Sequence, residues 1–281
     1  MMMEINMKAV KACAVWATAM AVCGLTRGAE LFGTKFDLDS GASHVQGICC
    51  SDEAVYFSQD KFLYKCDWQG NLVRKVAAVN HTGDLCWSEG RLYASICLRK
   101  PEPGGERGFI IVYDGDLNEV RRSKPFMRPA DGIVRMGDVL YVGLGSNTPD
   151  PPKPHRKNFF AKFDLKTLEM IGEMKSVDYG FETRFGVQDI ATDGKNLLFM
   201  FYGVGDGPWT AIVDTDFNLI RPVHGFTACN GLDPLPASRG GDGKTYLRAT
   251  TVDRRRSGGV EEHRIRVSFD TVIFDGKDRM K

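Results

Sequence analysis

Polar side chains recur at five places where an apolar run begins. The five segments read HVQGI, HTGDL, PADGI, GVQDI and CNGLD. Core strands normally open on apolar residues, so carboxylates, amides and imidazoles crowded at such points must be satisfied by one another, by water, by a metal ion or by a bound ligand. The residues concerned are Gln46, Asp84, Asp131, Gln188, Asp189 and Asn230, together with His44 and His81.

Three of these residues have the chemistry of a catalytic site. Asp84 and Asp131 could act as general acid and base or as ligands of a hard cation, and His81 could transfer a proton or bind a metal. His44 holds the equivalent place in the preceding segment, so the two histidines could act together. Each aspartate could equally be a structural hydrogen-bond acceptor. The remaining histidines are expected in loops or at the surface: His155, His224 and His263.

Longer connecting segments carry further candidates for ligand binding. Glu182 and Arg184 lie in VDYGFETRF, which is expected to be a loop just ahead of GVQDI. Trp209 ends GDGPW, and an indole face can pack on the apolar face of a sugar ring, although an ordinary tight turn is the alternative. The expected ligand contacts are His44, Gln46, Gln188, Asp189, Asn230, Glu182, Arg184 and Trp209. The expected metal ligands are Asp131 and Asn230, for calcium or zinc.

Two markers alternate along the chain and define the elements that must position these residues. The first is an apolar strand ending in aspartate before a short turn, at Asp67, Asp114, Asp164, Asp214 and Asp275. The second is an apolar strand with an aromatic residue at one fixed place: Tyr56, Tyr93, Tyr141, Phe199 and Tyr246. A carboxylate after a strand can accept hydrogen bonds from backbone two residues further on. We therefore predict that the five aspartates form turns and are not catalytic.

The repeated units predict an all-β, five-bladed β-propeller. The markers recur near the ~40–50 residues of a four-stranded blade, and no long stretch has a helical period. The polar segments then form the innermost strands, which converge on a central channel. Loops entering these strands and loops between second and third strands share one face, the upper mouth. The last unit lacks an outer strand, and the segment 30–39 is predicted to complete that blade and close the ring.

The first thirty residues differ from the rest. Lys8 and Lys11 precede an apolar stretch from Ala12 to Val22, and small residues follow, which is typical of a secretory signal. The stretch is too short for a membrane span, which needs about 20 apolar residues. We expect a signal peptide over 1–29, whose cleavage site stays open, and a single propeller domain over 30–281. The protein is thus expected to be exported, to the periplasm or outside the cell.

Composition excludes several classes of partner. Lys and Arg number 37 and Asp and Glu 36, so the net charge of +1 creates no field that attracts nucleic acid or an anionic membrane. No nucleophile-elbow, zinc-protease, P-loop or dinucleotide pattern occurs. Cysteines beyond the signal form no CxxC pair, and most lie in apolar runs, so buried thiols are favoured although export permits disulfides. They are Cys49, Cys50, Cys66, Cys86, Cys97 and Cys229.

Two segments, HVQGICCSDEAVYFSQDKFLYKCD and GVQDIATDGKNLLFMF, resemble blades of the glutamine cyclotransferase family. That resemblance implies a five-bladed propeller that converts amino-terminal glutamine to pyroglutamate. The second blade of the family opens with glutamate in an EGL-like context, near which this chain has Asp84. PADGIV and CNGLD are similar to the metal-binding blade starts of SMP-30/gluconolactonase-like propellers. Asp131 and Asn230 match those ligands in type, while His44 and Gln46 replace the first-blade glutamate.

Two functional hypotheses follow. In the first, an exported monomeric propeller binds a small polar molecule or a carbohydrate at the upper mouth. In the second, the same polar ring belongs to a metal-dependent hydrolase or lactonase-like enzyme, or to a lyase or cyclotransferase-like enzyme, with Asp84, Asp131 and His81 as its catalytic groups. An enzyme requires a perturbed titratable group or a bound ion among these residues, which separates the two hypotheses.

Overall fold

The computed structural model of the chain describes residues 30–36, 45–79, 81–98, 100–145, 153–205, 207, 209–224, 226–257 and 260–271, with backbone alone for 30–36 and 250–271. This part of the chain is all-β, with one short 3-10 turn, η1 (Ala237–Arg239), and no α-helix. Within it, no helix is long and apolar enough to cross a membrane. The predicted signal peptide, His44 and Asp275 lie outside the described residues.

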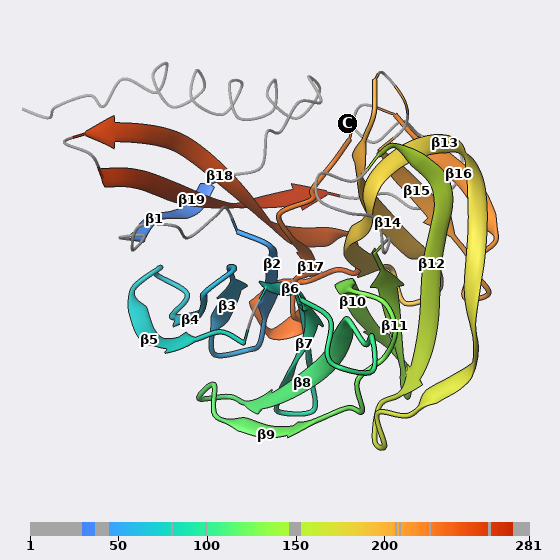
Figure 1. Cartoon of the computed structure of the whole chain (residues 1–281). Coiled ribbons are helices and arrows are strands. Elements are labelled where there is room, and N and C mark those ends of the chain that lie inside the picture. The colour runs from blue at the N-terminus through green and yellow to red at the C-terminus, as the bar shows by residue number, and fades with distance from the viewer. Residues whose placement is uncertain are drawn as a thin grey trace, which may run out of the picture.

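Two four-stranded antiparallel sheets come first (Figure 1). One consists of β2 (Gly47–Cys50), β3 (Val55–Ser58), β4 (Phe62–Cys66) and β5 (Leu72–Ala77). The next consists of β6 (His81–Ser88), β7 (Arg91–Cys97), β8 (Gly108–Asp114) and β9 (Glu119–Arg122). In both sheets each strand pairs with the next one along the chain, in an antiparallel meander.

The third sheet has seven strands. They are β10 (Ala130–Met136), β11 (Val139–Leu144), β12 (His155–Asp164), β13 (Met170–Thr192), β14 (Leu197–Gly203), β15 (Thr210–Val213) and β16 (Leu219–Val223). Its length comes from β13, whose first part pairs with β12 and whose second part pairs with β14. The segment VDYGFETRF therefore lies in a strand, and the expectation of a loop there was wrong. Thr183 pairs on both sides, with His155 and with Gly203, so the backbone continues from one ladder into the other.

The last sheet joins the two ends of the chain. Its strand order is β1 (Glu30–Phe36), β19 (Val260–Thr271), β18 (Thr245–Ser257) and β17 (Leu232–Pro234). β1 runs antiparallel to β19, with Phe32 opposite Val267. The segment predicted to be an outer strand thus pairs with the sheet of the last repeat unit.

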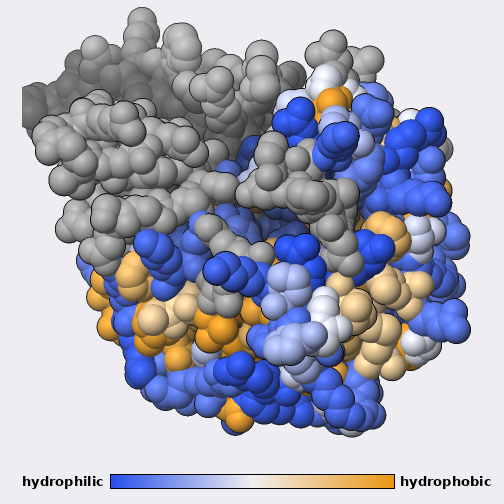
Figure 2. Space-filling model, viewed as in Figure 1, coloured by the Kyte–Doolittle hydropathy of each residue, from blue (hydrophilic) through white to orange (hydrophobic). Residues whose placement is uncertain are grey.

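Five hydrophobic clusters fill the spaces between neighbouring sheets or halves of the long sheet. Successive residues of a strand serve different clusters: Cys50 and Phe57 pack toward β18, whereas Cys49 and Tyr56 pack toward β7 and β8. Burial of both faces explains why these strands read as continuous apolar runs. Outer strands are more open, and Figure 2 shows hydrophobic groups over the region of β4 and β5, where Leu72 and Val73 are exposed.

The turns behave as predicted at four of the five aspartates. Oδ1 of Asp67 accepts hydrogen bonds from the backbone N–H of Gln69 at 2.9 Å and of Asn71 at 2.8 Å. Equivalent contacts to the following backbone occur at the other three turns, those of Asp114, Asp164 and Asp214. Their role as turn formers is therefore confirmed.

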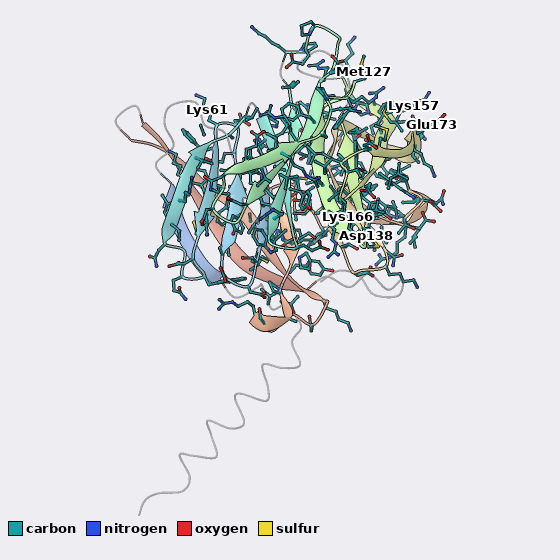
Figure 3. All side chains as sticks on the ribbon, turned by 90° about the horizontal axis from the view of Figure 1, so that it is seen from below. Lys61, Met127, Asp138, Lys157, Lys166 and Glu173 are labelled. Carbon is teal, nitrogen blue, oxygen red and sulfur yellow. The ribbon has the colours of Figure 1, made fainter. Side chains whose placement is uncertain are left out.

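The inner strands contact one another in sequence. β2 contacts β6, β6 contacts β10, β10 contacts β13, β13 contacts β17, and β17 contacts β2. Figure 3 shows Lys61, after β3, and Met127, before β10, on the side of the molecule away from Asp138 and Lys166, which lie in the turns after β10 and β12. We call the end of the molecule at which the chain enters the inner strands the mouth.

Candidate functional site

A carboxylate joins three inner strands below the mouth. Oδ1 of Asp84 accepts a hydrogen bond from the N–H of Leu85 at 2.7 Å, and Oδ2 accepts from Ile133 N at 3.0 Å and Ile190 N at 3.2 Å. The free edge of an inner strand presents N–H groups that must find acceptors when they are buried. Asp84 supplies acceptors for β6, β10 and β13 at once, which is the structural role named above as its alternative.

Two further aspartates act in the same way, and with Asp84 they form the axial layer: Asp84, Asp189 and Asp233. Oδ2 of Asp189 accepts from Leu232 N at 3.2 Å, and Oδ2 of Asp233 accepts from Cys50 N at 2.9 Å. Burial raises the pKa of all three carboxyls, that of Asp233 to about 7, and the charge of Asp84 raises the pKa of Asp189 further. Each group therefore links one inner strand to another and has little access to a ligand.

Glycine and aspartate alternate at this level of the five inner strands. The aligned residues are Gly47, Asp84, Gly132, Asp189 and Gly231. A Cβ on Gly47 would lie 2.5 Å from Asp84 Cα, and a Cβ on Gly231, whose φ is +124°, would lie 2.5 Å from Ile48 N. The backbones of adjacent inner strands thus approach one another closely. Two kinds of residue fit at these positions: a glycine, which has no side chain, and an aspartate whose carboxylate bonds to the neighbouring N–H groups.

A second group of polar side chains lies at the mouth, above the axial layer. Nδ1 of His81 forms a short ion-pair contact with Oδ1 of Asp60, which also accepts from Gln46 Nε2 at 3.2 Å. On the other side of the imidazole, Nε2 of His81 is 4.0 Å from Asp131 Oδ1. We call these four residues and Gln188 the mouth cluster: Gln46, Asp60, His81, Asp131 and Gln188.

The mouth cluster contains a carboxyl that titrates near neutrality. Burial raises the pKa of Asp131 to about 6, although the nearby His81 imidazole and Gln188 amide lower it in part. The amide nitrogen of Gln188 is buried and has no hydrogen-bond partner of normal geometry among the described residues. An oriented imidazole next to a carboxyl of raised pKa suits proton transfer or the binding of a polar ligand.

Two residues of this site were not predicted. Asp60 lies in the short SQD loop after β3. A carboxylate in a loop at the mouth could have marked it as a site residue, but only long loops were considered as places for ligand contacts. Tyr202 is the second-last residue of β14, where burial, and then the charges of Cys229, Asp131 and Asp60, raise its pKa. Two carboxylates of the mouth cluster therefore act electrostatically on Tyr202.

Other predicted ligand contacts lie apart from this cluster. Asn230 donates its amide N–H to Val45 O at 2.7 Å and so ties the start of β17 to β2. Glu182 and Arg184 are exposed on β13. Trp209 lies over Gly203, where a Cβ would be 1.6 Å from its indole ring.

His155 differs from the expectation of a surface or loop residue. It begins β12 opposite Thr183 and is half-buried. Both ring nitrogens are buried without a hydrogen-bond partner among the described residues, and burial lowers the pKa of the imidazole. It is therefore a neutral packing residue. His224, in contrast, is exposed as expected.

The described residues do not assemble a cation site. They contain no group of three or more His, Cys, Asp or Glu side chains placed to hold a metal ion. The amide of Asn230 is engaged with backbone, and Asp131 faces His81. The six described cysteines are free thiols, four of them buried.

Comparison with known proteins identifies the architecture. No protein family matches the sequence, and no curated protein matches it. Among solved structures, glutaminyl cyclase from Myxococcus xanthus is 10% identical, with a TM-score of 0.54 over 88% of this chain and 97% of that one. The GH43_1 enzyme from Xanthomonas citri, solved with xylotriose, is 13% identical, with a TM-score of 0.54 over 93% and 95%.

The fold is that of a β-propeller. Identities of 10% and 13% establish the fold alone, since one propeller architecture serves many unrelated functions. The blades of a propeller surround a central channel. In this chain the axial layer links neighbouring inner strands, and the mouth cluster lies at one end of those strands.

Proposed function

We propose that the chain is an exported, five-bladed propeller that binds a small polar ligand or a glycan at its mouth cluster. The observation that carries this proposal is the position of His81, held by Asp60 on one side and facing Asp131 on the other. Each carboxylate of the axial layer accepts a hydrogen bond from a backbone N–H group of a neighbouring strand, whereas these three side chains meet one another at the mouth.

The blade count rests on packing. Five hydrophobic clusters alternate with the sheets, and the long sheet divides at β13 into two four-stranded halves. The contacts among inner strands run from β2 round to β17 and back to β2. Pairing of β1 with β19 supplies the fourth strand of the last blade. These features support a ring of five blades closed by β1.

Ligand binding is supported by partial exposure and unfilled hydrogen-bonding capacity. The side chain of His81 is 19% exposed and that of Asp131 10%, so both can be reached from solvent although each is mostly desolvated. Gln188 adds an amide without a partner of normal geometry among the described residues. Buried donors and acceptors that lack partners favour a ligand able to satisfy them.

A second candidate function is acid–base catalysis at the same cluster. The Asp60 carboxylate orients His81 through Nδ1, which leaves Nε2 to accept a proton from a bound water or ligand group. Asp131, with its pKa raised to about 6, holds a proton more readily than an ordinary aspartate and can return one to a leaving group. A hydrolase, lyase or cyclotransferase-like reaction without a metal would use these two roles.

The decisive experiment compares cluster variants with a matched histidine control. Wild type, Asp131→Asn, His81→Asn and His224→Asn would be screened on glycan and small-metabolite arrays, and hits would be measured by calorimetry. We expect the two cluster variants to lose at least about tenfold in affinity and His224→Asn to bind like wild type. Equal binding by all four proteins would refute a site at the mouth cluster. Turnover of a hit, lost in both cluster variants, would favour the enzyme.

Export is part of the proposal and has its own test. The sequence pattern of residues 1–29 predicts removal of that segment. Amino-terminal sequencing of protein recovered from the periplasm or medium should begin near residue 22–30. Retention of the full chain inside the cell would refute export and leave the binding proposal standing.

A further inference from the structure

Phe185 has a strained backbone without the burial that normally offsets strain. Its φ is +62°, a region that bulky side chains rarely adopt. The other aromatic or aliphatic residues with positive φ are Leu117, Leu168 and Phe217, and all three lie in aspartate turns with at most 3% of their surface exposed. Phe185 is 39% exposed. Strain at an exposed aromatic residue indicates a functional constraint.

A bulge in β13 holds Phe185 in this position. The register between β13 and β14 shifts between Arg184 and Val187, so Phe185 and Gly186 lie outside the regular ladder. Gly186 has φ +103°, and a Cβ there would lie 2.9 Å from Leu144 O. Bulges commonly redirect a side chain beside a functional site, and here the bulge presses β13 against the end of β11.

The same bulge brings Phe185 next to the mouth cluster. A Cβ on Gly145 would lie 2.9 Å from the carbonyl oxygen of Phe185 and 3.2 Å from Oδ2 of Asp131. Only a glycine therefore separates the bulge from the Asp131 carboxyl. The phenyl ring of Phe185 lies 5.7 Å from that of Tyr202, at 73°. This edge-to-face pair, Phe185 and Tyr202, is called the aromatic pair.

We propose that the aromatic pair binds the ring of a neutral sugar whose hydroxyl groups reach the mouth cluster. This inference deepens the proposed function and rests on it. Aromatic faces pack against the C–H face of a pyranose, and carboxylates and amides accept and donate hydrogen bonds to its hydroxyls. The juxtaposition of both kinds of surface matches an amphipathic, polyhydroxylated ring.

Charge at the site disfavours the other ligand classes. Asp60 and Asp131 repel an anion. A cation is disfavoured because His81 already lies between the two carboxylates. A neutral ligand meets neither obstacle.

Trp209 provides a matched control. It lies on the side of β14 to which Gly203 points, and Gly203 follows Tyr202 directly, so the indole is on the opposite face of the strand from the aromatic pair. Trp209 and Phe185 are equally exposed, at 38% and 39%. Phe185→Ala and Trp209→Ala therefore each remove an aromatic side chain of similar exposure, from opposite faces of β14.

The experiment measures binding of xylotriose, cellotriose, maltotriose and mannotriose by isothermal titration calorimetry to the mature protein and its variants. We expect at least one of these sugars to bind, Phe185→Ala to weaken that binding about tenfold, and Trp209→Ala to change it less than about twofold. Phe185→Gly should bind as weakly as Phe185→Ala but melt about 2–4 °C higher, because glycine relieves the positive φ.

Failure of this inference is distinguishable from failure of the proposed function. If none of the four sugars binds, or if Phe185→Ala binds them like wild type, the sugar platform is overturned. Binding of an amino-terminal glutaminyl peptide that depends on Asp131 and not on Phe185 also overturns it, while the mouth cluster keeps its function. Sugar binding that depends on Phe185 and is unchanged in His81→Asn and Asp131→Asn would leave the aromatic pair as a sugar-binding surface, but it would refute the mouth cluster and, with it, the proposed contacts of the sugar hydroxyls.

Discussion

Asp84 and Asp131 occupy neighbouring inner strands, in GDL and DGI respectively, and differ by the order of glycine and aspartate. One position further along the strand puts the Asp84 carboxylate in the axial layer, where three N–H groups bond to it. Asp131, one position earlier, reaches the mouth cluster and faces His81. Because successive residues of a strand point to opposite sides, a shift of one residue decides between a structural and an accessible carboxyl.

Asp84→Ala should lower the free energy of unfolding more than any other substitution in the two groups. It would leave the buried N–H groups of Ile133 and Ile190 without an acceptor, and each such loss costs about 1–3 kcal/mol. We expect the free energy of unfolding to fall by at least about 3 kcal/mol in urea titrations, or the protein to be recovered unfolded. A loss below about 1 kcal/mol would show that the axial layer is dispensable.

The pH dependence of stability should follow the buried carboxyls of both regions. In the folded state Asp131 and Asp233 have pKa values of about 6 and 7, above the unfolded value of about 4. Between these limits the native state holds protons that the unfolded state releases, so stability should fall as pH rises from about 4 to 7, by on the order of a few kcal/mol.

The turn aspartates contribute with the opposite sign. Hydrogen bonds from Asn71 lower the pKa of Asp67, and similar contacts lower those of Asp114 and Asp164, so their stabilisation is lost as pH falls below about 4. Maximum stability is therefore expected near pH 4–5. Urea titrations at pH 4.5, 6.0 and 7.5 measure the slope, and Asp233→Asn should flatten it. A slope unchanged in that variant would contradict the raised pKa of Asp233.

Asp131→Asn should change the free energy of unfolding much less than Asp84→Ala does. At pH 5 the Asp131 carboxyl is mostly protonated, and an amide is close to it in size, so the free energy of unfolding should change by less than about 1 kcal/mol. Above pH 7 the variant should be slightly more stable than wild type, because no buried charge has to form. Destabilisation comparable to that of Asp84→Ala would place Asp131 in the structural group.

Metal removal should have the smallest effect of all. Calcium and zinc were expected at Asp131 and Asn230, but the described residues do not assemble three ligands there. We predict melting temperatures that agree within about 1 °C with EDTA, calcium or zinc present. Elemental analysis that finds one divalent ion per chain, with a lower melting temperature after chelation, would contradict this and restore the metal-dependent hypothesis.

The repeat pattern predicted most of the strands. Asp67 and its counterparts form turns, and Tyr56 and its counterparts are buried in second strands, because both depend on local chemistry and on strand periodicity. His81, Asp131 and Gln46 were recognised as polar residues in apolar surroundings. The segment around Phe185 was misjudged because its pairing partners lie on both sides of one long strand, which local propensity does not reveal.

The sequence alone shows which residue types begin each inner strand. Glycine or aspartate stands at the position where neighbouring backbones approach most closely, and mostly amides and carboxylates stand one residue before it. The role that each of these residues takes depends on the tertiary structure. Asp60 meets His81 across two sheets, Asp84 bonds to strands that lie 49 and 106 residues away, and the bulge at Phe185 brings its backbone carbonyl close to the Asp131 carboxyl, with Gly145 between them. These relations depend on how the sheets pack, and the distance between residues in different sheets is set by the backbone contacts that the inner glycines allow.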